Sequence, residues 1–532
     1  MTAMDDGSAV TTFSAEPVNS KENRSLYEAR KRIHPKRAEG FYRSLKWVVM
    51  AATLGVYYIT PWIRWDRGEY APDQAVLIDL ANARFYFFFI EIWPQEFFFV
   101  AGLLVMAGIG LFLVTSTVGR AWCGYTCPQT VWVDLFLVVE RAVEGDRNAR
   151  IRLDKEPMSA SKFSKRFTKH AIWLLIAVAT GGAWIFYFAD APTLAKDLFT
   201  LQAPFIAYAT VGVLAATTYI FGGLLREQVC TYMCPWPRIQ AAMLDENSLT
   251  VTYNNWRGEP RSRHAKRVRA EGKLVGDCVD CNACVAVCPM GIDIREGQQL
   301  ECITCALCID ACNGVMEKIG FEHGLISYAT LAEYDTNMRV SGSQRIDVAG
   351  DIVWDPASID PEKVRPQESK LNTEFKHTGL SSFIRPRTLV YIAIWCALGL
   401  GLLAALFMRD RLDINVRHDR NPLYVVLSDG AIRNGYEVKI LNMKLEPRSF
   451  RLSVAGLKGA SIWLAGGQDT AGKSLKVDVK PDQLKAMKVF VRAPRSSITA
   501  QKQGFQFVVE TIGGQENETY EAQFVSPEGV VK

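Results

Sequence analysis

The sequence predicts a multi-domain membrane protein that combines an α-helical bundle of five transmembrane helices, a cysteine-rich insert and an all-β C-terminal domain. Three observations predict this architecture: five long apolar runs, tight groups that contain all but one of the 13 cysteines, and alternating apolar residues near the C-terminus. The chain has 532 residues, more than a single domain usually holds. Its net charge is only +5, so composition gives no sign of nucleic-acid binding.

The N-terminal half contains four of the five predicted membrane spans. Residues 1–40 are polar and are expected to form a disordered cytoplasmic tail without a cleavable signal. A span needs about 20 mostly apolar residues. The aromatic stretch Phe85–Trp93 is shorter, so we expect it to lie at the membrane interface. Four spans are expected within residues 41–225 and a fifth at 388–408; they are Leu45–Ile63, Glu96–Val118, Ala171–Ala189, Ala203–Leu225 and Thr388–Met408.

Basic residues indicate the orientation of these spans. They are dense before the first span and in the loop after the second, whereas the loop between these two spans is poorer in them. Loops rich in Lys and Arg stay in the cytoplasm. We therefore expect a cytoplasmic N-terminus, a cytoplasmic region at residues 226–387 and an extracytoplasmic domain at 409–532.

Residues 409–532 show the period-two alternation of β-strands. Turn signals such as Asn434-Gly435 interrupt the alternation, which predicts a small antiparallel sandwich. The segment has no cysteine and a lone histidine, His418, so docking or scaffolding is expected there rather than catalysis. The alternating residues are Tyr436, Val438 and Ile440; Phe450, Leu452 and Val454; Leu475, Val477 and Val479; and Phe505, Phe507 and Val509.

The strongest motif is a duplicated cysteine run in the cytoplasmic region. Cys278-x2-Cys281-x2-Cys284-x3-Cys288-Pro289 is followed by Cys302-x2-Cys305-x2-Cys308-x3-Cys312. Three thiolates at this spacing surround one iron–sulfur cube, while the fourth reaches the other cube. The run predicts a ferredoxin-like domain at about 268–320 with two [4Fe-4S] clusters; zinc sites use C-x2-C pairs instead. We expect one cluster on Cys278, Cys281, Cys284 and Cys312, and the other on Cys302, Cys305, Cys308 and Cys288. Asn313 replaces the proline expected after the last cysteine, which is not a ligand position.

Two further cysteine pairs share the pattern C-x3-C-P, and each follows a predicted span. They are Cys123-Gly-Tyr-Thr-Cys127-Pro128 and Cys230-Thr-Tyr-Met-Cys234-Pro235. Proline favours the first helical position, so helices are expected to begin there, and a helix N-terminus favours a thiolate. The four thiolates could converge on a redox-active metal, because soft sulfur selects Cu(I), zinc or iron–sulfur centres. A redox disulfide and incidental placement at helix ends are the alternatives.

Other redox motifs are missing from the sequence. No G-x-G-x-x-G follows a strand, no C-x-x-C unit precedes a histidine, and no span carries a central histidine for haem. Electrons must therefore enter from a partner or from a quinol. Asp134 and Glu140, which follow Pro128, could belong to a quinol site, but we expect them on a solvated helix face.

The combination of these features resembles the FixG/RdxA/CcoG family of cytochrome c oxidase accessory proteins. The resemblance covers nearly the whole chain after about Glu22 and implies a bacterial inner-membrane polyferredoxin with an immunoglobulin-like periplasmic domain. It implies a cupric reductase, an oxidoreductase that turns Cu(II) into Cu(I) for copper transporters, copper chaperones and oxidase assembly factors. It assigns copper, the substrate, to Cys123, Cys127, Cys230 and Cys234, and the clusters to the eight cysteines of the insert.

Two other functions fit the same residues. One is a quinol-linked electron-transfer subunit that serves a protein partner without copper chemistry. The other is a scaffold for oxidase assembly in which the clusters are structural. The expected partners are the lipid bilayer, an electron donor (a ferredoxin, a flavoprotein or a quinol) and a possible second copy of the chain, but no nucleic acid.

Overall fold

The computed structural model describes residues 11–15, 17, 32–271, 275–340, 344–346, 352–354, 384–466, 471–514 and 516–528. Most of the tail that we expected to be disordered lies outside these residues. The chain divides into two compact units, one mainly before Leu400 and one mainly after Gly401, and each is described by itself.

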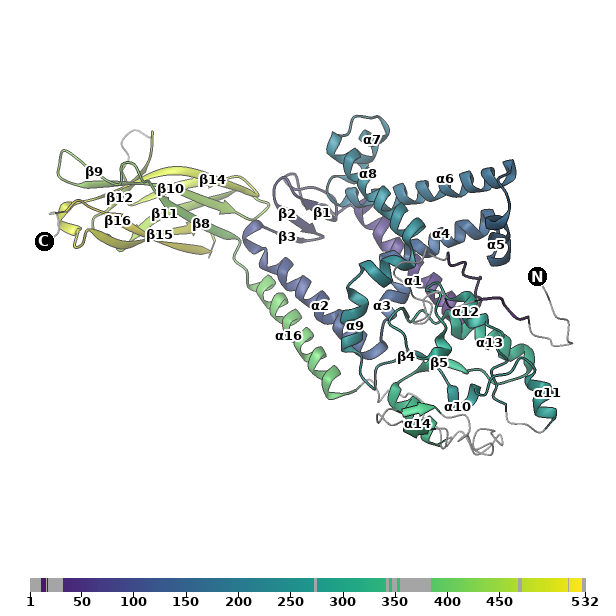
Figure 1. Ribbon diagram of the computed structural model, residues 1–532. Helices are drawn as coiled ribbons and strands as arrows, with labels where there is room; N and C mark the ends of the chain where they lie inside the picture. Colours follow the sequence, from purple (N-terminus) through teal and green to yellow (C-terminus); the bar gives the residue numbers. More distant parts are fainter. Residues whose placement is uncertain are drawn as a thin grey trace. The chain divides into compact units, whose positions relative to one another are not determined.

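Four helices among the described residues are long and apolar enough to cross a membrane (Figure 1). They match four of the predicted spans: α2 (Phe98–Val118), α6 (Ala160–Gly182), α8 (Phe205–Thr218) and α16 (Pro386–Met408). Short extensions lengthen three of them: η2 (Pro94–Glu96), η3 (Ala183–Tyr187) and the π-helical η4 (Tyr219–Leu225). The protein is therefore a membrane protein.

The predicted first span forms a helix whose most apolar stretch is less apolar than those of the other four. It folds as α1 (Phe41–Ile59) with the short turn η1 (Thr60–Trp62), but it is not among the four apolar helices. Its first turns carry Arg43 and Lys46, whose side chains are buried against other parts of the protein. The count of five spans stays a prediction.

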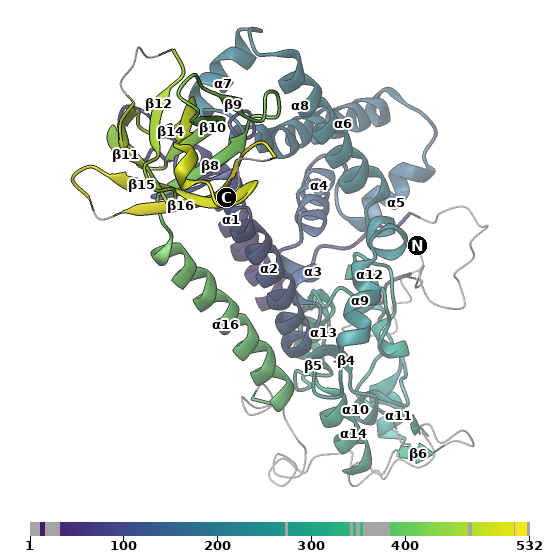
Figure 2. The same ribbon diagram turned by 90° about the vertical axis from the view of Figure 1, so that its left-hand side faces the viewer.

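Helices α2 and α16 lie side by side in both views (Figures 1 and 2). Trp395 joins them by donating a hydrogen bond from Nε1 to the carbonyl oxygen of Met106, at 3.1 Å. Their other faces carry exposed large apolar side chains such as Leu104 and Leu400, as expected for helices whose solvent is lipid.

The aromatic stretch before α2 is a small sheet. Strands β1 (Val76–Asp79), β2 (Arg84–Phe87) and β3 (Ile90–Ile92) form it in that order. The Arg84 guanidinium lies 3.8 Å from the centre of the Trp93 ring and pairs with Glu91 at 3.4 Å. These contacts order a segment that hydropathy alone assigned to the interface.

The end of the predicted tail is packed. Ile33 and Ala38 are buried, and the Lys36 amide donates to the carbonyl oxygen of Ala286 at 2.8 Å. Residues 32–40 thus differ from a disordered tail because their backbone makes hydrogen bonds with the cysteine-rich insert and with Arg147 and Arg150.

The remaining elements before α16 are short. Between the spans lie α3 (Ala121–Tyr125), α4 (Pro128–Glu144), α5 (Arg147–Lys155) and α7 (Ala191–Phe199). After η4 come the π-helical η5 (Val229–Met233) and α9 (Trp236–Met243). The insert contains β4 (Thr250–Tyr253), α10 (Asn255–Gly258), α11 (Ala265–Ala270), α12 (Ala283–Val287), η6 (Ile294–Glu296), α13 (Leu307–Ile319), β5 (Ile326–Ala329), α14 (Leu331–Val340), β6 (Gln344–Ile346) and β7 (Ile352–Trp354). Strands β4 and β5 pair antiparallel and bring the two ends of the insert together.

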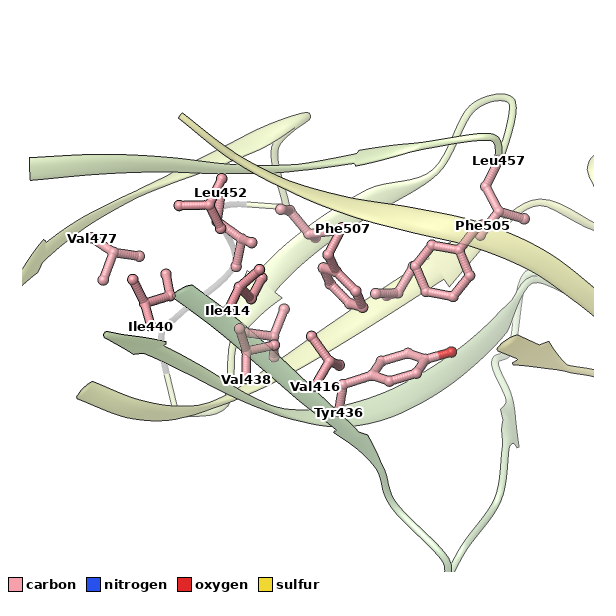
Figure 3. Packing of buried hydrophobic residues seen from close by; sticks show 14 of the residues in the cluster. Ile414, Val416, Tyr436, Val438, Ile440, Leu452, Leu457, Val477, Phe505 and Phe507 are labelled. Carbon is pink, nitrogen blue, oxygen red and sulfur yellow. The ribbon is translucent and has the colours of Figure 1, made fainter. Parts of the chain in front are cut away.

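The C-terminal domain is the predicted β-sandwich. One sheet has the order β12-β14-β10-β8, with β9 beside β10, and the other has the order β13-β11-β15-β16. Figure 3 shows the apolar side chains of the two sheets facing one another. Of the twelve alternating residues predicted, ten are at most 3% exposed, and Val454 and Leu475 pack against them. The strands are β8 (Leu412–His418), β9 (Val425–Val426), β10 (Ile432–Asn442), β11 (Arg448–Ala455), β12 (Ser461–Leu464), β13 (Ser474–Val479), β14 (Gln483–Ala493), β15 (Lys502–Thr511) and β16 (Asn517–Val525), with the short turn η10 (Arg495–Ser497).

The turn predicted at Asn434-Gly435 was wrong. Both residues lie inside strand β10 and pair with β14. A Cβ on Gly435 would lie 2.4 Å from a carboxylate oxygen of Asp419, so a larger residue would require that side chain to shift. An Asn-Gly dipeptide, which usually indicates a turn, can therefore also occur inside a strand where a neighbouring side chain comes close.

Candidate functional site

The two cysteine runs of the insert share one backbone geometry. Asp280 and Asn282 have positive φ values of 49° and 56°, and the equivalent Thr304 and Ala306 have 56° and 59°. Left-handed φ values are uncommon for such residues and cluster where the chain curls around a bound group. The internal duplication in the sequence is thus a duplication of structure.

The first cavity of the insert brings together the four cysteines expected to share a cluster. Its other lining residues include Tyr253, Asn282, Met316 and Arg295. The Arg295 guanidinium is held by Asp293 at 2.6 Å and Asp280 at 2.8 Å, so a buried cation lies beside the thiols. The four cysteines are Cys278, Cys281, Cys284 and Cys312.

The second cavity brings together the other four cysteines. It is lined by apolar residues such as Val251, Ile292 and Leu307, and Cys284 borders it as well as the first cavity. The two cavities are similar in volume, about 380 Å³ and 330 Å³ with their openings included. The cysteines of the second set are Cys288, Cys302, Cys305 and Cys308. The chemistry of both donor sets, four soft thiols around an apolar cavity, fits a [4Fe-4S] cluster.

Burial keeps these thiols neutral in the absence of a bound group. It raises the pKa of Cys288 and Cys312 to about 12 and that of Cys302 to about 11, and neighbouring thiols contribute. Metals bind the thiolate, so loading the cavities must release protons.

The C-x3-C-P motifs have the local structure that proline predicts. Cys127 is the extended residue before α4, whose first residue is Pro128. Cys234 is extended too, and α9 follows Pro235. The remaining cysteines lie in short helical segments, Cys123 in α3 and Cys230 in η5.

The four motif cysteines, here called the thiol quartet, lie near one another. Burial raises the pKa of Cys123 and of Cys230 to about 12, and charges on other members of the quartet add to both shifts. Helix α4 ties the first motif to the chain just before the second, because Gln129 Nε2 donates to the carbonyl oxygens of Phe221 and Arg226. The Cys123 thiol donates to Gln240 Oε1 at 3.2 Å.

Within the described part of the chain, no three His, Cys, Asp or Glu side chains approach closely enough to bind a single metal ion. This finding covers the insert as well as the thiol quartet. The quartet as it stands could offer a single ion no more than two thiolates.

The thiol quartet packs directly against the second cavity. Cys123 and Cys230 belong to the same apolar cluster as Ile303 and Cys305. A Cβ on Gly124 would lie 2.7 Å from the carbonyl oxygen of Ile303 and 3.1 Å from the Cα of Cys305. The α3 backbone therefore touches the loop that carries two cysteines of the second set.

We expect Gly124→Ala to force α3 away from this loop. The added methyl meets backbone atoms, which cannot rotate aside, so the expected loss of stability is about 1–3 kcal/mol. The matched control is Gly108→Ala in α2, where nothing lies within 4 Å of the added Cβ. Melting temperature and iron content in detergent are the measurements. Equal values for both variants would contradict the close contact.

Arg120 connects the thiol quartet to the second cavity. It is 4% exposed and donates to the carbonyl oxygens of Leu300, Cys302 and Pro237. Burial lowers the pKa of its guanidinium, and the nearby Cys302 and Cys123 thiols counteract this effect. A cation in this position stabilises negative charge on either side of it.

The expectation that Asp134 and Glu140 lie on a solvated face was wrong. Asp134 binds Lys46 Nζ at 2.8 Å and Arg43 Nη1 at 3.1 Å, and both acids are about 5% exposed. Burial alone would raise the pKa of Asp134, but the two cations, Lys46 first, outweigh it and lower the pKa. The basic partners come from distant segments, so no local pattern in the sequence indicated these pairs.

Comparisons with known proteins agree with the cysteine motifs. The family described as "4Fe-4S dicluster domain" matches residues 225–331, and one described as "4Fe-4S binding domain" matches residues 98–143. The family described as "IG-like fold at C-terminal of FixG" matches residues 402–527. The first two matches contain the insert and both C-x3-C-P motifs.

Three curated relatives match nearly end to end. The nitrogen fixation protein FixG of Rhizobium meliloti is 62% identical over 97% of both chains. Protein RdxB of Cereibacter sphaeroides is 51% identical over 90% of this chain and 92% of the relative, and RdxA of the same organism is 49% identical over 89% and 91%. A solved FixG-related protein from Vibrio parahaemolyticus is 20% identical, covers 22% of this chain and 97% of its own, and has a TM-score of 0.19.

Proposed function

The chain belongs to the FixG/RdxA/CcoG family, and from this premise we propose that it reduces Cu(II) to Cu(I) for assembly of a haem-copper cytochrome c oxidase. That it is an iron–sulfur electron-transfer protein of the membrane follows from its family matches and apolar helices. What we propose beyond this is that copper is the electron acceptor. The observation that carries it is the thiol quartet, which packs against the cavity of the second cysteine set.

The roles of the cysteines follow from their positions. The eight insert cysteines would hold two [4Fe-4S] clusters, with Cys288 and Cys312 exchanged between the runs as the two cavities suggest. A bound cluster accepts and releases one electron at a time. Thiolates of the quartet, at most two at a time, would bind the substrate copper, and soft sulfur favours Cu(I) over Cu(II). Each Cu(II) then takes one electron and leaves as Cu(I).

The proposal includes an orientation in the bacterial inner membrane. The insert and the thiol quartet would face the cytoplasm, where copper transporters and chaperones could receive Cu(I), and residues 409–532 would face the periplasm. The basic residues around the predicted spans support this orientation. It requires α1 as a fifth span.

Anaerobic reduction of copper tests the proposal. The protein is reduced with dithionite, excess reductant is removed, and Cu(II) is added with a Cu(I)-specific chromophore. We expect cluster reoxidation to accompany Cu(I) formation, at up to about two Cu(I) per chain because each cluster supplies one electron. Reduced clusters that ignore Cu(II) would favour a quinol-linked subunit that serves a protein partner.

The double substitution Cys123→Ser, Cys127→Ser locates the copper site. We expect it to abolish Cu(I) formation while the cluster absorbance stays unchanged, because the insert keeps all its thiols. The matched control is Cys396→Ser, which removes an exposed cysteine of α16 that belongs neither to the insert nor to the thiol quartet. Unchanged copper reduction in the double variant would refute the assignment of copper to the quartet.

A further inference from the structure

A third cavity adjoins the second cysteine set. Its volume is about 1110 Å³ with its open mouth included, and Val251, Ile294 and Cys302 line both it and the cavity of the second set. A molecule held there would touch a cysteine that we assign to a cluster. The other lining residues used below are Arg120, Ala241, Asp245, Glu246 and Gln299.

Polar groups in this cavity have unused hydrogen-bonding capacity. Arg120 is buried, and within the described residues its Nε has no hydrogen-bond partner, although its other nitrogens are satisfied. Gln299 Oε1 is buried and likewise unpartnered among these residues, while Gln299 Nε2 donates to the carbonyl oxygen of Asp293. Buried polar atoms are usually paired, so a ligand that draws either side chain towards the cavity would supply the missing partner.

The wall of the cavity is fastened to the ends of two membrane helices. Leu249 donates its amide to the carbonyl oxygen of Thr117 in α2, at 3.1 Å. Arg385 and Arg387, at the start of α16, hold the Asp245 carboxylate at 2.7 Å and 3.1 Å, and Arg385 also donates to Ser116. The cavity therefore lies where α2 ends and α16 begins, within reach of the edge of the bilayer.

We propose that this cavity binds a membrane quinol, the electron donor for the reduction of copper; this inference rests on the proposed function. A quinol head group has a flat ring with oxygen atoms that donate and accept hydrogen bonds, which suits a cavity lined by the polar residues Arg120, Gln298 and Gln299. Its lipid solubility matches a site at the membrane edge. Asp134 and Glu140 cannot serve it, because buried cations already occupy both carboxylates.

The electron balance also fits. A quinol that becomes a quinone releases two protons and two electrons, and the two clusters assigned to the insert can take one electron each. Glu246 is exposed at the cavity and can accept a proton and pass it to water. The Asp245 carboxylate is already bound by Arg385, Arg387 and Ser248. Its role is therefore to hold the wall of the cavity in place.

Photolabelling of the full-length protein in detergent with an azido-ubiquinone tests the site. We expect label in peptides that contain residues 241–250 and 298–304. Ala241→Trp fills the cavity and should reduce labelling about tenfold, a change equivalent to about 1.4 kcal/mol of binding free energy. Ala242→Trp is the matched control, because Ala242 is exposed on the same helix and does not line the cavity. Equal labelling of the two variants, or label confined to other peptides, would overturn the proposal.

Reduction by a quinol separates this inference from the proposed function. Decylubiquinol should reduce the clusters of the parent protein anaerobically, and Gln299→Leu should slow this reduction without lowering iron content. The Ala241→Trp and Gln299→Leu variants should both still reduce Cu(II) after dithionite treatment, because dithionite reduces the clusters without the cavity. Failure of quinol reduction with intact dithionite-driven copper reduction would overturn the quinol site alone. Failure of the dithionite reaction would overturn the copper function.

Discussion

A Cys288→Ser, Cys302→Ser double variant is expected to retain about half of the iron of the parent protein, whereas a Cys278→Ser, Cys288→Ser double variant is expected to lose nearly all of it. The difference follows from the two cavities of the insert. Cys288 shares a cavity with Cys302, so the first double variant damages one site. Cys278 lines the other cavity, so the second damages both.

The two variants are matched controls for each other. Each removes two insert cysteines and one of the two is Cys288, so a general effect of lost thiols would act equally on both. Iron analysis and the electron paramagnetic resonance of the reduced protein are the measurements. If each run held its own cluster, the iron contents of the two variants would be reversed. That outcome would refute the exchange of Cys288 and Cys312 between the runs.

Substitution Glu140→Gln is expected to destabilise the protein by about 3–5 kcal/mol, because it leaves buried cations without their counter-charge. Glu140 is buried and binds Arg226 at 2.5 Å, Arg150 at 2.7 Å and Lys169 at 3.7 Å. Burial alone would raise the pKa of Glu140, but the three cations, Arg226 first, outweigh it and lower the pKa from 4.5 to about 2.

The sign of the pH dependence follows from this lowered pKa. The carboxylate stabilises the fold fully above pH 4.5, and the stabilisation is lost as pH falls from there towards about 2. The difference between the two pKa values corresponds to about 3 kcal/mol. The parent protein should therefore lose more stability than Glu140→Gln over this interval.

Thermal unfolding in detergent, followed by circular dichroism at several pH values, measures both effects. We expect Glu140→Gln to melt about 5 °C or more below the parent at pH 7. The control is Glu156→Gln, since Glu156 is half-exposed and its pair with Arg152 at 3.9 Å is worth under about 0.5 kcal/mol. Similar melting temperatures for the two variants would contradict the buried network.

Features that depend on short-range spacing were readable from the sequence. The cysteine runs predicted the iron–sulfur insert because cluster ligands must recur at intervals set by the size of the cube. Apolar runs predicted α2, α6, α8 and α16 because a bilayer requires a minimum length of apolar chain. Alternation predicted the sandwich core, with Tyr436 and Phe507 fully buried, because side chains of a strand alternate between two faces. Cys127 and Cys234 lie before new helices, as proline indicated.

Only the tertiary structure decided which of these features meet. Gly124 and Ile303 are far apart in the sequence, yet their contact places the thiol quartet against the second cysteine set. Asp134 looked solvated because its partners, Arg43 and Lys46, come from another helix. The cavity around Arg120 is likewise assembled from separate segments. Spacing constrains neighbours along one element, whereas contacts between elements depend on packing of the whole chain, which no local pattern records.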